Sequence, residues 1–219
     1  WAESVIESML YILWDLKLKV GHASRTVADC LRLARQDYTI RTALLEHRFV
    51  VGHEPLARDL SIRLRNELFR TTGPAFIEAK LEERSERHKR QGGQRYVLEP
   101  NVKEGKGGLR DLQNLYWIAK YIHAVDNASQ LLDKGVFRLE EYLAFAAAED
   151  FLWAVRCHLH LIAHRAVDQL TFDMQVEVAS RMGYQDGAGR RAVEHFMQDY
   201  FRHATRVGEL TRVFLTVLE

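Results

Sequence analysis

The sequence predicts a mainly helical protein, with a helical bundle domain attached to a small α/β part near the start of the chain. Over most of the 219 residues, apolar side chains recur at three- and four-residue spacing, which is typical of helices with one buried face. Only three prolines and 13 glycines interrupt these patterns. Residues 16–20 (LKLKV) instead alternate apolar and basic side chains, which predicts a half-buried strand.

Helices in the first quarter of the chain are indicated by stripes and caps. Thr26 followed by Asp29 resembles a capping pair at the start of one helix, and Asp37 predicts the start of the next. A helix before the strand is predicted by an apolar stripe at Val5, Met9, Ile12, Leu13 and Trp14. The helix after Asp37 is expected to end at Gly52 and to bury Ile40, Leu44, Leu45 and Phe49.

The remaining helices are predicted in the same way. Pro55 and Pro74 stand where first-turn prolines of two helices belong. The second of these runs into EERSERHKRQGGQR, which predicts a solvated helix end and a flexible turn, followed by a short strand at residues 95–98. Helices are expected at residues 139–163 and 174–181. A final helix is expected to bury Val193, Phe196, Tyr200, Val207 and Phe214.

Composition narrows the class of protein. With 47% hydrophobic and 28% charged residues, the chain suits one folded unit of moderate size or two small, closely packed ones. A net charge of +1 gives no broad attraction to nucleic acid or to a membrane, and neither is expected as a partner. The two cysteines, Cys30 and Cys157, favour a reducing cytoplasm. The helical pattern begins at once without an initiator methionine, which predicts a piece of a longer protein.

Residues 101–111 (NVKEGKGGLRD) carry the strongest chemical signal. A glycine pair stands at the start of a predicted helix, where backbone N–H groups and the helix dipole attract anions. With Lys103 and Lys106 beside it, the segment is a candidate phosphate-binding corner. The same residues fit a polar loop in which Arg110 and Asp111 pair within the first helical turn, and the motif alone leaves both possibilities open.

Candidate metal ligands are weaker. In RCHLHLIAHR a helix places His160 and His164 one turn apart, but no carboxylate completes a known motif, so structural or surface roles are predicted for both. The chain contains no Asp-x-Asp and no His-Asp dipeptide, two common signatures of divalent metals in nucleotidyl transfer and phosphodiester hydrolysis. Solvated helix faces are predicted for the carboxylates Glu82, Glu83, Glu86, Glu140, Glu141, Glu149 and Asp150.

Two segments, LWDLKLKVGHASRTVADC and LEPNVKEGKGGLRDLQNLYWIAKY, resemble the bacterial PII uridylyltransferase/uridylyl-removing enzyme family. The likeness extends to the later segment LTFDMQVEVASRMGY. It implies transfer of UMP from UTP to a tyrosine of the PII nitrogen-regulatory protein, and removal of UMP by hydrolysis in a separate domain. It also implies that residues 1–54 are the distal part of a polymerase-β-like nucleotidyltransferase domain, and that residues 55–219, with the 101–111 motif, form a helical domain.

The resemblance also implies what this chain lacks. In such enzymes a Gly-Ser loop and an Asp-x-Asp pair hold Mg²⁺ and the triphosphate, and neither occurs here. The chain is therefore expected to be an inactive fragment, with Mg²⁺ held mainly by residues outside it. The His-Asp hydrolase domain and the domains that sense the effector glutamine would also lie outside.

A nucleotide-binding set follows from the resemblance. Lys103, Lys106 and Arg110 would be cationic partners of the UTP phosphates. Gly107 and Gly108 would let the backbone approach the ligand closely.

Four further residues are assigned roles near this set. Asp111 would orient Arg110 or bind a ribose hydroxyl. His22 and Arg25, in the VGHASRT part of the first matching segment, are expected to face the same cleft, with His22 either contacting nucleotide or bracing the strand. Glu104 is a candidate substitute for a missing metal-binding carboxylate.

Two other functions remain as alternatives. Glutamine-synthetase adenylyltransferase, from the same superfamily, has a comparable glycine pair but favours Asp-Ile-Glu after it, whereas this chain has RDLQ. A helical interaction module without nucleotide chemistry is the other alternative.

Overall fold

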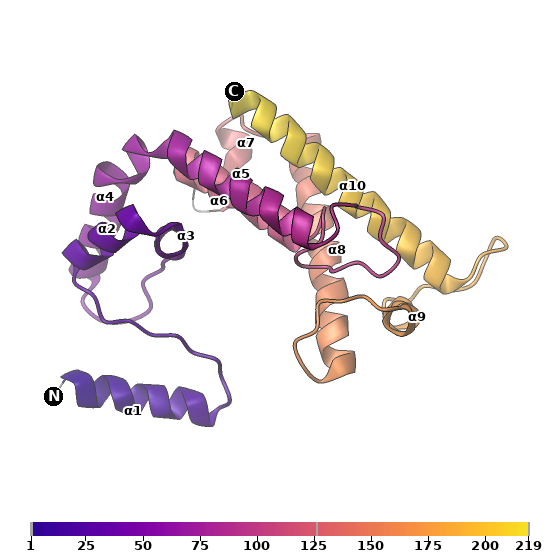
Figure 1. The fold of residues 1–219 in the computed structure, drawn as a ribbon, viewed down its shortest axis with the longest axis horizontal. Helices are drawn as coiled ribbons and strands as arrows, with labels where there is room; N and C mark the ends of the chain where they lie inside the picture. Colours follow the sequence, from indigo (N-terminus) through magenta and orange to yellow (C-terminus); the bar gives the residue numbers. More distant parts are fainter. Residues whose placement is uncertain (1, 126, 219) are drawn as a thin grey trace.

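A computed structural model gives the arrangement of residues 2–125 and 127–218, and helices make up most of it (Figure 1). In chain order they are α1 (Ala2–Asp15), α2 (Val27–Gln36), α3 (Tyr38–Leu45), α4 (Glu54–Glu67), the 3-10 turn η1 (Phe69–Thr71), α5 (Gly73–Arg90), α6 (Leu109–His123), α7 (Gln130–Asp133), α8 (Leu139–Ala163), α9 (Phe172–Arg181) and α10 (Ala192–Leu218). The prediction of a mainly helical fold is confirmed. None of the described helices is both long and apolar enough to cross a membrane.

Both predicted strands are wrong. Residues 16–20 leave α1 as a turn followed by irregular chain, with Leu16 and Leu18 65% and 51% exposed. Residues 95–98 are irregular as well. A strand is stable only beside a partner that completes its hydrogen bonds, and the described residues contain isolated bridges but no such partner. The α/β character predicted for the start of the chain is therefore not observed among the described residues.

The predicted caps define α2 and α3. Thr26 Oγ1 accepts a hydrogen bond from the backbone N–H of Asp29 at 3.1 Å. Asp37 Oδ1 accepts from the backbone N–H groups of Thr39 at 2.6 Å and Ile40 at 3.0 Å. Each cap satisfies donors that the first helical turn cannot pair internally, so these helix starts follow from local sequence.

α3 is shorter than predicted and ends at Leu45. Phe49 lies beyond it and is 48% exposed, so the prediction that Phe49 packs inward is wrong. After α3 the chain turns towards α4, where His47 Nε2 lies 2.8 Å from Ser61 Oγ. This contact joins residues that lie far apart in the sequence. Apolar spacing within one helix, which predicted a longer α3, carries no information about it.

The later helices lie close to their predicted positions. Pro55 and Pro74 fall in the first turns of α4 and α5. α8 has the predicted limits, and α9 begins at Phe172, slightly before the predicted start. The predicted inner face of α10 is buried at Phe196, Tyr200, Val207 and Phe214.

α6 is the helix around which the others pack. It contacts α3, α5, α8 and α10, and residues on more than one of its faces are buried. Near its end, the Tyr121 ring stacks on Phe76 of α5, with ring centroids 3.9 Å apart and planes 7° apart. The Tyr121 hydroxyl lies 2.6 Å from Thr72 Oγ1. Burial of aromatic side chains of this size contributes about 1.5–3 kcal/mol each, which holds α5 against α6.

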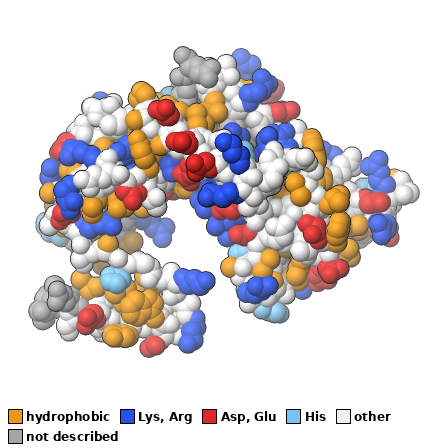
Figure 2. Space-filling model, in the orientation of Figure 1, with side chains coloured by type: hydrophobic (Ala, Val, Ile, Leu, Met, Phe, Trp, Pro, Cys, Tyr) orange, Lys and Arg blue, Asp and Glu red, His pale blue; other side chains and the backbone are white. Residues whose placement is uncertain are grey.

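α1 lies apart from the other helices (Figure 1). Hydrophobic side chains are visible on its surface (Figure 2), and Met9, Tyr11 and Ile12 are 56%, 63% and 60% exposed. The predicted domain boundary after residue 54 falls at the start of α4, and α2 packs on α4 across it. That boundary stays a prediction.

Candidate functional site

The 101–111 segment is a tightly folded loop that leads into α6. Asn101 Oδ1 accepts hydrogen bonds from the backbone N–H groups of Lys103 at 3.1 Å and Glu104 at 2.7 Å. The Asn101 backbone oxygen accepts a third from Gly105 at 2.9 Å. An asparagine that bonds to its own following backbone is a common turn-forming device, so the loop conformation is set locally.

The glycine pair allows close packing of the loop. Gly107 has a φ of 85°, and a Cβ there would lie 2.3 Å from the backbone oxygen of Ala204 in α10. A Cβ on Gly108 would lie 2.6 Å from the backbone oxygen of Val102. Both positions therefore require glycine for reasons internal to the fold. The prediction that they also approach phosphate stays a prediction.

Backbone N–H groups at the start of α6 already have acceptors. Gly107 N–H donates to Asp111 Oδ2 at 2.8 Å, and Gly108 N–H donates to the Gly105 oxygen at 2.9 Å. Arg110 N–H donates to the Lys103 oxygen at 2.9 Å. An anion at this loop would therefore be bound by side chains rather than by these backbone donors.

Asp111 is fully buried among basic side chains of α5. Its carboxylate accepts from Arg84 Nε at 3.2 Å and from an Nη of Arg87, and His88 Nε2 lies 2.9 and 3.0 Å from its two oxygens. Burial alone would raise the pKa of the Asp111 carboxyl. The hydrogen bond from His88 and the charges of the three basic partners outweigh burial and hold that pKa below its ordinary value.

These contacts correct two predictions. Asp111 binds α5 and does not orient Arg110, so neither proposed pairing of the two residues is observed. The α5 end is also not solvated all round, because Arg87 is only 4% exposed, although Glu82, Glu83 and Glu86 do face solvent. Spacing of three and four residues places Arg84, Arg87 and His88 on one helix face, a signal that the sequence contains.

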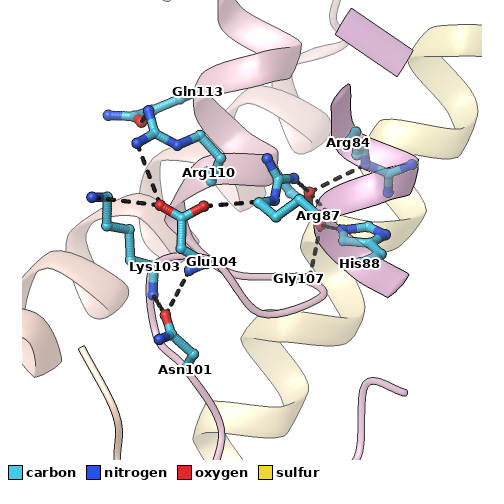
Figure 3. A network of polar contacts seen from close by, with 10 residues as sticks. Arg84, Arg87, His88, Asn101, Lys103, Glu104, Gly107, Arg110 and Gln113 are labelled. Atoms are coloured by element: carbon cyan, nitrogen blue, oxygen red, sulfur yellow. Dashed lines mark hydrogen bonds and ion pairs between the residues drawn. The ribbon is translucent and has the colours of Figure 1, made fainter. Parts of the chain in front are cut away.

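A second carboxylate, Glu104, lies among three cations (Figure 3). Its Oε1 is 3.4 Å from both Arg110 Nη2 and Lys103 Nζ, and its Oε2 is 3.9 Å from Arg87 Nε. Arg110 Nη1 also donates to Gln113 Oε1 at 2.8 Å. Three cations already surround the Glu104 carboxylate, an arrangement that does not favour a metal ligand.

A pocket of about 490 Å³ opens beside Glu104 and Arg110. This size lies within the range of small-molecule sites. Lys80, Arg87 and Trp117 are among the lining residues that the sequence patterns do not single out. The α3–α5–α6 pocket is lined by Thr39, Thr42 and Ala43 of α3, Glu46 just after α3, Lys80, Glu83, Arg87 and Arg90 of α5, Glu104 of the loop, and Arg110 and Trp117 of α6.

Lys106 lies on the other side of the loop. It lines a smaller pocket of about 180 Å³ together with Arg90, Arg95 and Tyr200. Lys106 makes no hydrogen bond or ion pair with another described residue. The loop thus presents Arg110 to one pocket and Lys106 to the other, while Arg90 lines both.

His22 and Arg25 lie in the exposed segment between α1 and α2. The His22 ring packs edge-on against Trp14, with ring centroids 6.4 Å apart. Figure 1 shows this segment at the α1 end of the molecule, whereas the loop before α6 lies beside α10. Neither residue lines the pockets beside the loop, and nucleotide binding by His22 and Arg25 stays a prediction.

The far side of the loop is anchored on the segment before α9. Val102 N–H donates to the Asp168 backbone oxygen at 2.8 Å. The Asp168 carboxylate accepts from Arg156 Nε at 2.7 Å and lies 3.2 Å from His160 Nε2. His160 therefore has a protein partner in Asp168. The described residues contain no group of three or more His, Cys, Asp or Glu side chains that could hold a metal ion.

Fold and site together define a helical domain that presents a glycine-rich loop between two cation-lined pockets. The family model described as GlnD PII-uridylyltransferase matches residues 75–215. Relatives named bifunctional uridylyltransferase/uridylyl-removing enzyme are 72% identical in Cereibacter sphaeroides and 70% identical in Ruegeria pomeroyi, each over the whole of this chain. The chain belongs to the PII-uridylyltransferase family and spans about a quarter (24%) of the length of these relatives. No solved structure matches it significantly.

Asp111→Asn is expected to cost about 3–5 kcal/mol of unfolding free energy at pH 7, because it leaves buried Arg87 without its counter-charge. Denaturant unfolding measures the loss. The matched control is Glu67→Gln, which removes a partly exposed ion pair with Arg63 of 2.7 Å. The control is expected to cost much less, because solvent and salt screen an exposed ion pair. Equal costs for the two substitutions would contradict the anchoring role of Asp111.

The cost of Asp111→Asn is also expected to depend on pH. Because the pKa of Asp111 is lowered in the folded protein, its stabilisation is fully present above the ordinary value of 3.8 and is lost as pH falls through the folded-state pKa. The difference in unfolding free energy between wild type and variant should be level from pH 7 to about 5 and shrink in stronger acid. A difference that stays level in acid would contradict the lowered pKa.

Gly107→Ala and Gly92→Ala form a second matched pair, since both glycines have positive φ, 85° and 82°. No atom lies within 4 Å of a Cβ on Gly92, so this change is expected to cost only the backbone strain of about 1–2 kcal/mol. Gly107→Ala adds the clash with Ala204 and should cost at least about 1–3 kcal/mol more by denaturant unfolding. Similar losses at the two positions would show that the loop does not press on α10.

Proposed function

We propose that this chain is the central part of a bifunctional enzyme that transfers UMP from UTP to a tyrosine of the PII nitrogen-regulatory protein and removes it by hydrolysis in a separate domain. The observation that carries the proposal is the 72% identity, over the whole chain, with a relative named for both activities. The family description supplies the PII partner. These names favour the uridylyl enzyme over the adenylyltransferase alternative and over a module without nucleotide chemistry.

Within this enzyme, the chain binds and orients UTP through side chains of the 101–111 loop. Arg110 offers guanidinium donors to the α3–α5–α6 pocket, and Lys106 offers an ammonium group that has no other partner among the described residues. Lys103 adds a third positive charge next to Glu104. Cationic side chains fixed on a rigid loop favour the negative charge of a triphosphate without large reorganisation.

The described residues do not fit a Mg²⁺ site. Mg²⁺ prefers carboxylate and water oxygens in octahedral geometry. Positive charge surrounds the two carboxylates nearest the loop and would repel a divalent cation, since Asp111 pairs with α5 and Glu104 lies within 3.4–3.9 Å of three cations. We therefore place Mg²⁺ binding and the chemical step in a part of the enzyme outside this chain, and propose that the chain alone does not transfer UMP.

The remaining assignments follow from the same proposal. Glutamine acts as effector through domains outside this chain, and the enzyme works in the cytoplasm, where UTP and PII are available. Nothing in the net charge of +1 favours a nucleic-acid partner.

Arg110→Ala and Lys106→Ala in the full-length enzyme test the loop as the triphosphate site. Loss of a charge-assisted hydrogen bond of about 1.5–3 kcal/mol should raise the KM for UTP about tenfold or more. Because the two residues line different pockets, the larger effect identifies the pocket that UTP occupies. Arg181→Ala on α9, which removes an exposed pair with Glu177, is the control. Unchanged KM for UTP in both variants, with normal melting curves, would contradict the proposal.

A further inference from the structure

Basic side chains outnumber carboxylates in the lining of the α3–α5–α6 pocket. The basic ones are Lys80, Arg87, Arg90 and Arg110, and the acidic ones are Glu46, Glu83 and Glu104. Lys80 is 3% exposed, and its ammonium lies 2.8 Å from Glu83 Oε2 and 5.1 Å from the centre of the Trp117 ring. Lys80 is thus held in place by packing, so a ligand would meet it already ordered.

Arg87 brings an unused donor to this pocket. Its side chain is only 5% exposed, and one Nη is bound to Asp111. Nε and Nη1 are buried and have no hydrogen-bond partner, since Glu104 Oε2 is 3.9 Å from Nε. A buried guanidinium with unpaired N–H groups is costly, and an acceptor supplied by a ligand would remove that cost.

Glu104 occupies the position between the cations only loosely. Its contacts with Lys103, Arg110 and Arg87 are 3.4, 3.4 and 3.9 Å, which is longer than charge-assisted hydrogen bonds of about 2.7–2.9 Å. The Glu104 side chain is 29% exposed, so it already borders solvent. A phosphate group, with more acceptor oxygens than a carboxylate, can satisfy the same donors at shorter distances.

The two pockets beside the loop differ in capacity. The smaller, at about 180 Å³, lies below the usual range of about 300–1,000 Å³ for small-molecule sites, whereas the α3–α5–α6 pocket, at about 490 Å³, lies within it. The larger pocket is also lined by an aromatic side chain, Trp117. The Arg110 guanidinium lies 5.5 Å from the centre of the Trp117 ring.

We infer that the α3–α5–α6 pocket binds a phosphate-type anion, with Arg87 and Arg110 as its donors and Glu104 as the internal carboxylate that the anion displaces. This inference assigns a particular pocket to the phosphate groups. It rests on the function proposed above, because that function supplies the source of the anion. That source is the triphosphate of UTP or the inorganic pyrophosphate released from it. Arg87 acts in both the fold and the pocket, so it is not the residue to change first.

Calorimetric titration of the whole 219-residue chain without Mg²⁺ tests the inference, with inorganic pyrophosphate and UTP as separate probes. Arg110→Gln is expected to weaken binding about tenfold through the lost charge-assisted bonds. Glu104→Gln is expected to strengthen it, because it removes the competing charge. Arg181→Gln and Glu177→Gln are the controls, because they make the same changes of net charge on α9. Trp117→Phe, read by fluorescence, places the ligand in the pocket if it removes the signal change on binding.

Binding of both probes with this pattern identifies the phosphate groups as the ligand, and binding of UTP alone with the same pattern identifies the nucleotide. Binding of neither probe, or effects of Arg110→Gln and Glu104→Gln no larger than those of their controls, overturns the inference. A parallel assay of UMP transfer by the full-length enzyme separates the two proposals. Transfer without binding in this pocket rejects the pocket alone, and pyrophosphate binding without transfer rejects the proposed function alone.

Discussion

The buried carboxylate of Asp111 is the interaction on which the arrangement of the candidate site depends. It joins three parts of the chain, since it accepts from Arg84 and Arg87 of α5, belongs to the first turn of α6, and accepts from the N–H of Gly107 in the loop between them. A buried charge is tolerated only where several donors surround it, and here the donors come from α5 and from the loop itself. The loop therefore has little freedom to rearrange without exposing or orphaning this carboxylate.

Arg87 therefore contributes both to the stability of the fold and to the candidate site. Arg87 uses one Nη to hold Asp111, while its remaining donors lie beside Glu104 and the α3–α5–α6 pocket. The glycine pair supports the same arrangement, because Gly107 allows the loop to approach Ala204 of α10. Contacts with α10 and α5 thus fix the position of the loop. Its side chains Lys106 and Arg110 each line one of the two pockets beside it.

Local patterns in the sequence predict most of the helices and their caps, because apolar spacing and residues such as Asp37 act within one or two turns. The strand at residues 16–20 fails because a strand depends on a distant partner, which spacing does not report. The site is predicted only in outline. The sequence indicates the glycine pair and Arg110 as candidates, but it pairs Asp111 with its sequence neighbour, whereas the partners of Asp111 lie on α5. The spacing of Arg84, Arg87 and His88 contains that information, although a charged helix face is usually solvated.

Amide hydrogen exchange at two neighbouring residues tests the central role of Asp111 most directly. Gly107 N–H donates to the buried carboxylate at 2.8 Å, whereas Lys106, next to it, makes no hydrogen bond with another described residue. If Asp111 holds the loop closed, the Gly107 amide should exchange at least about 100-fold more slowly than the Lys106 amide, after correction for intrinsic rates. Similar rates at the two amides would show that the loop opens freely and that Asp111 does not anchor it.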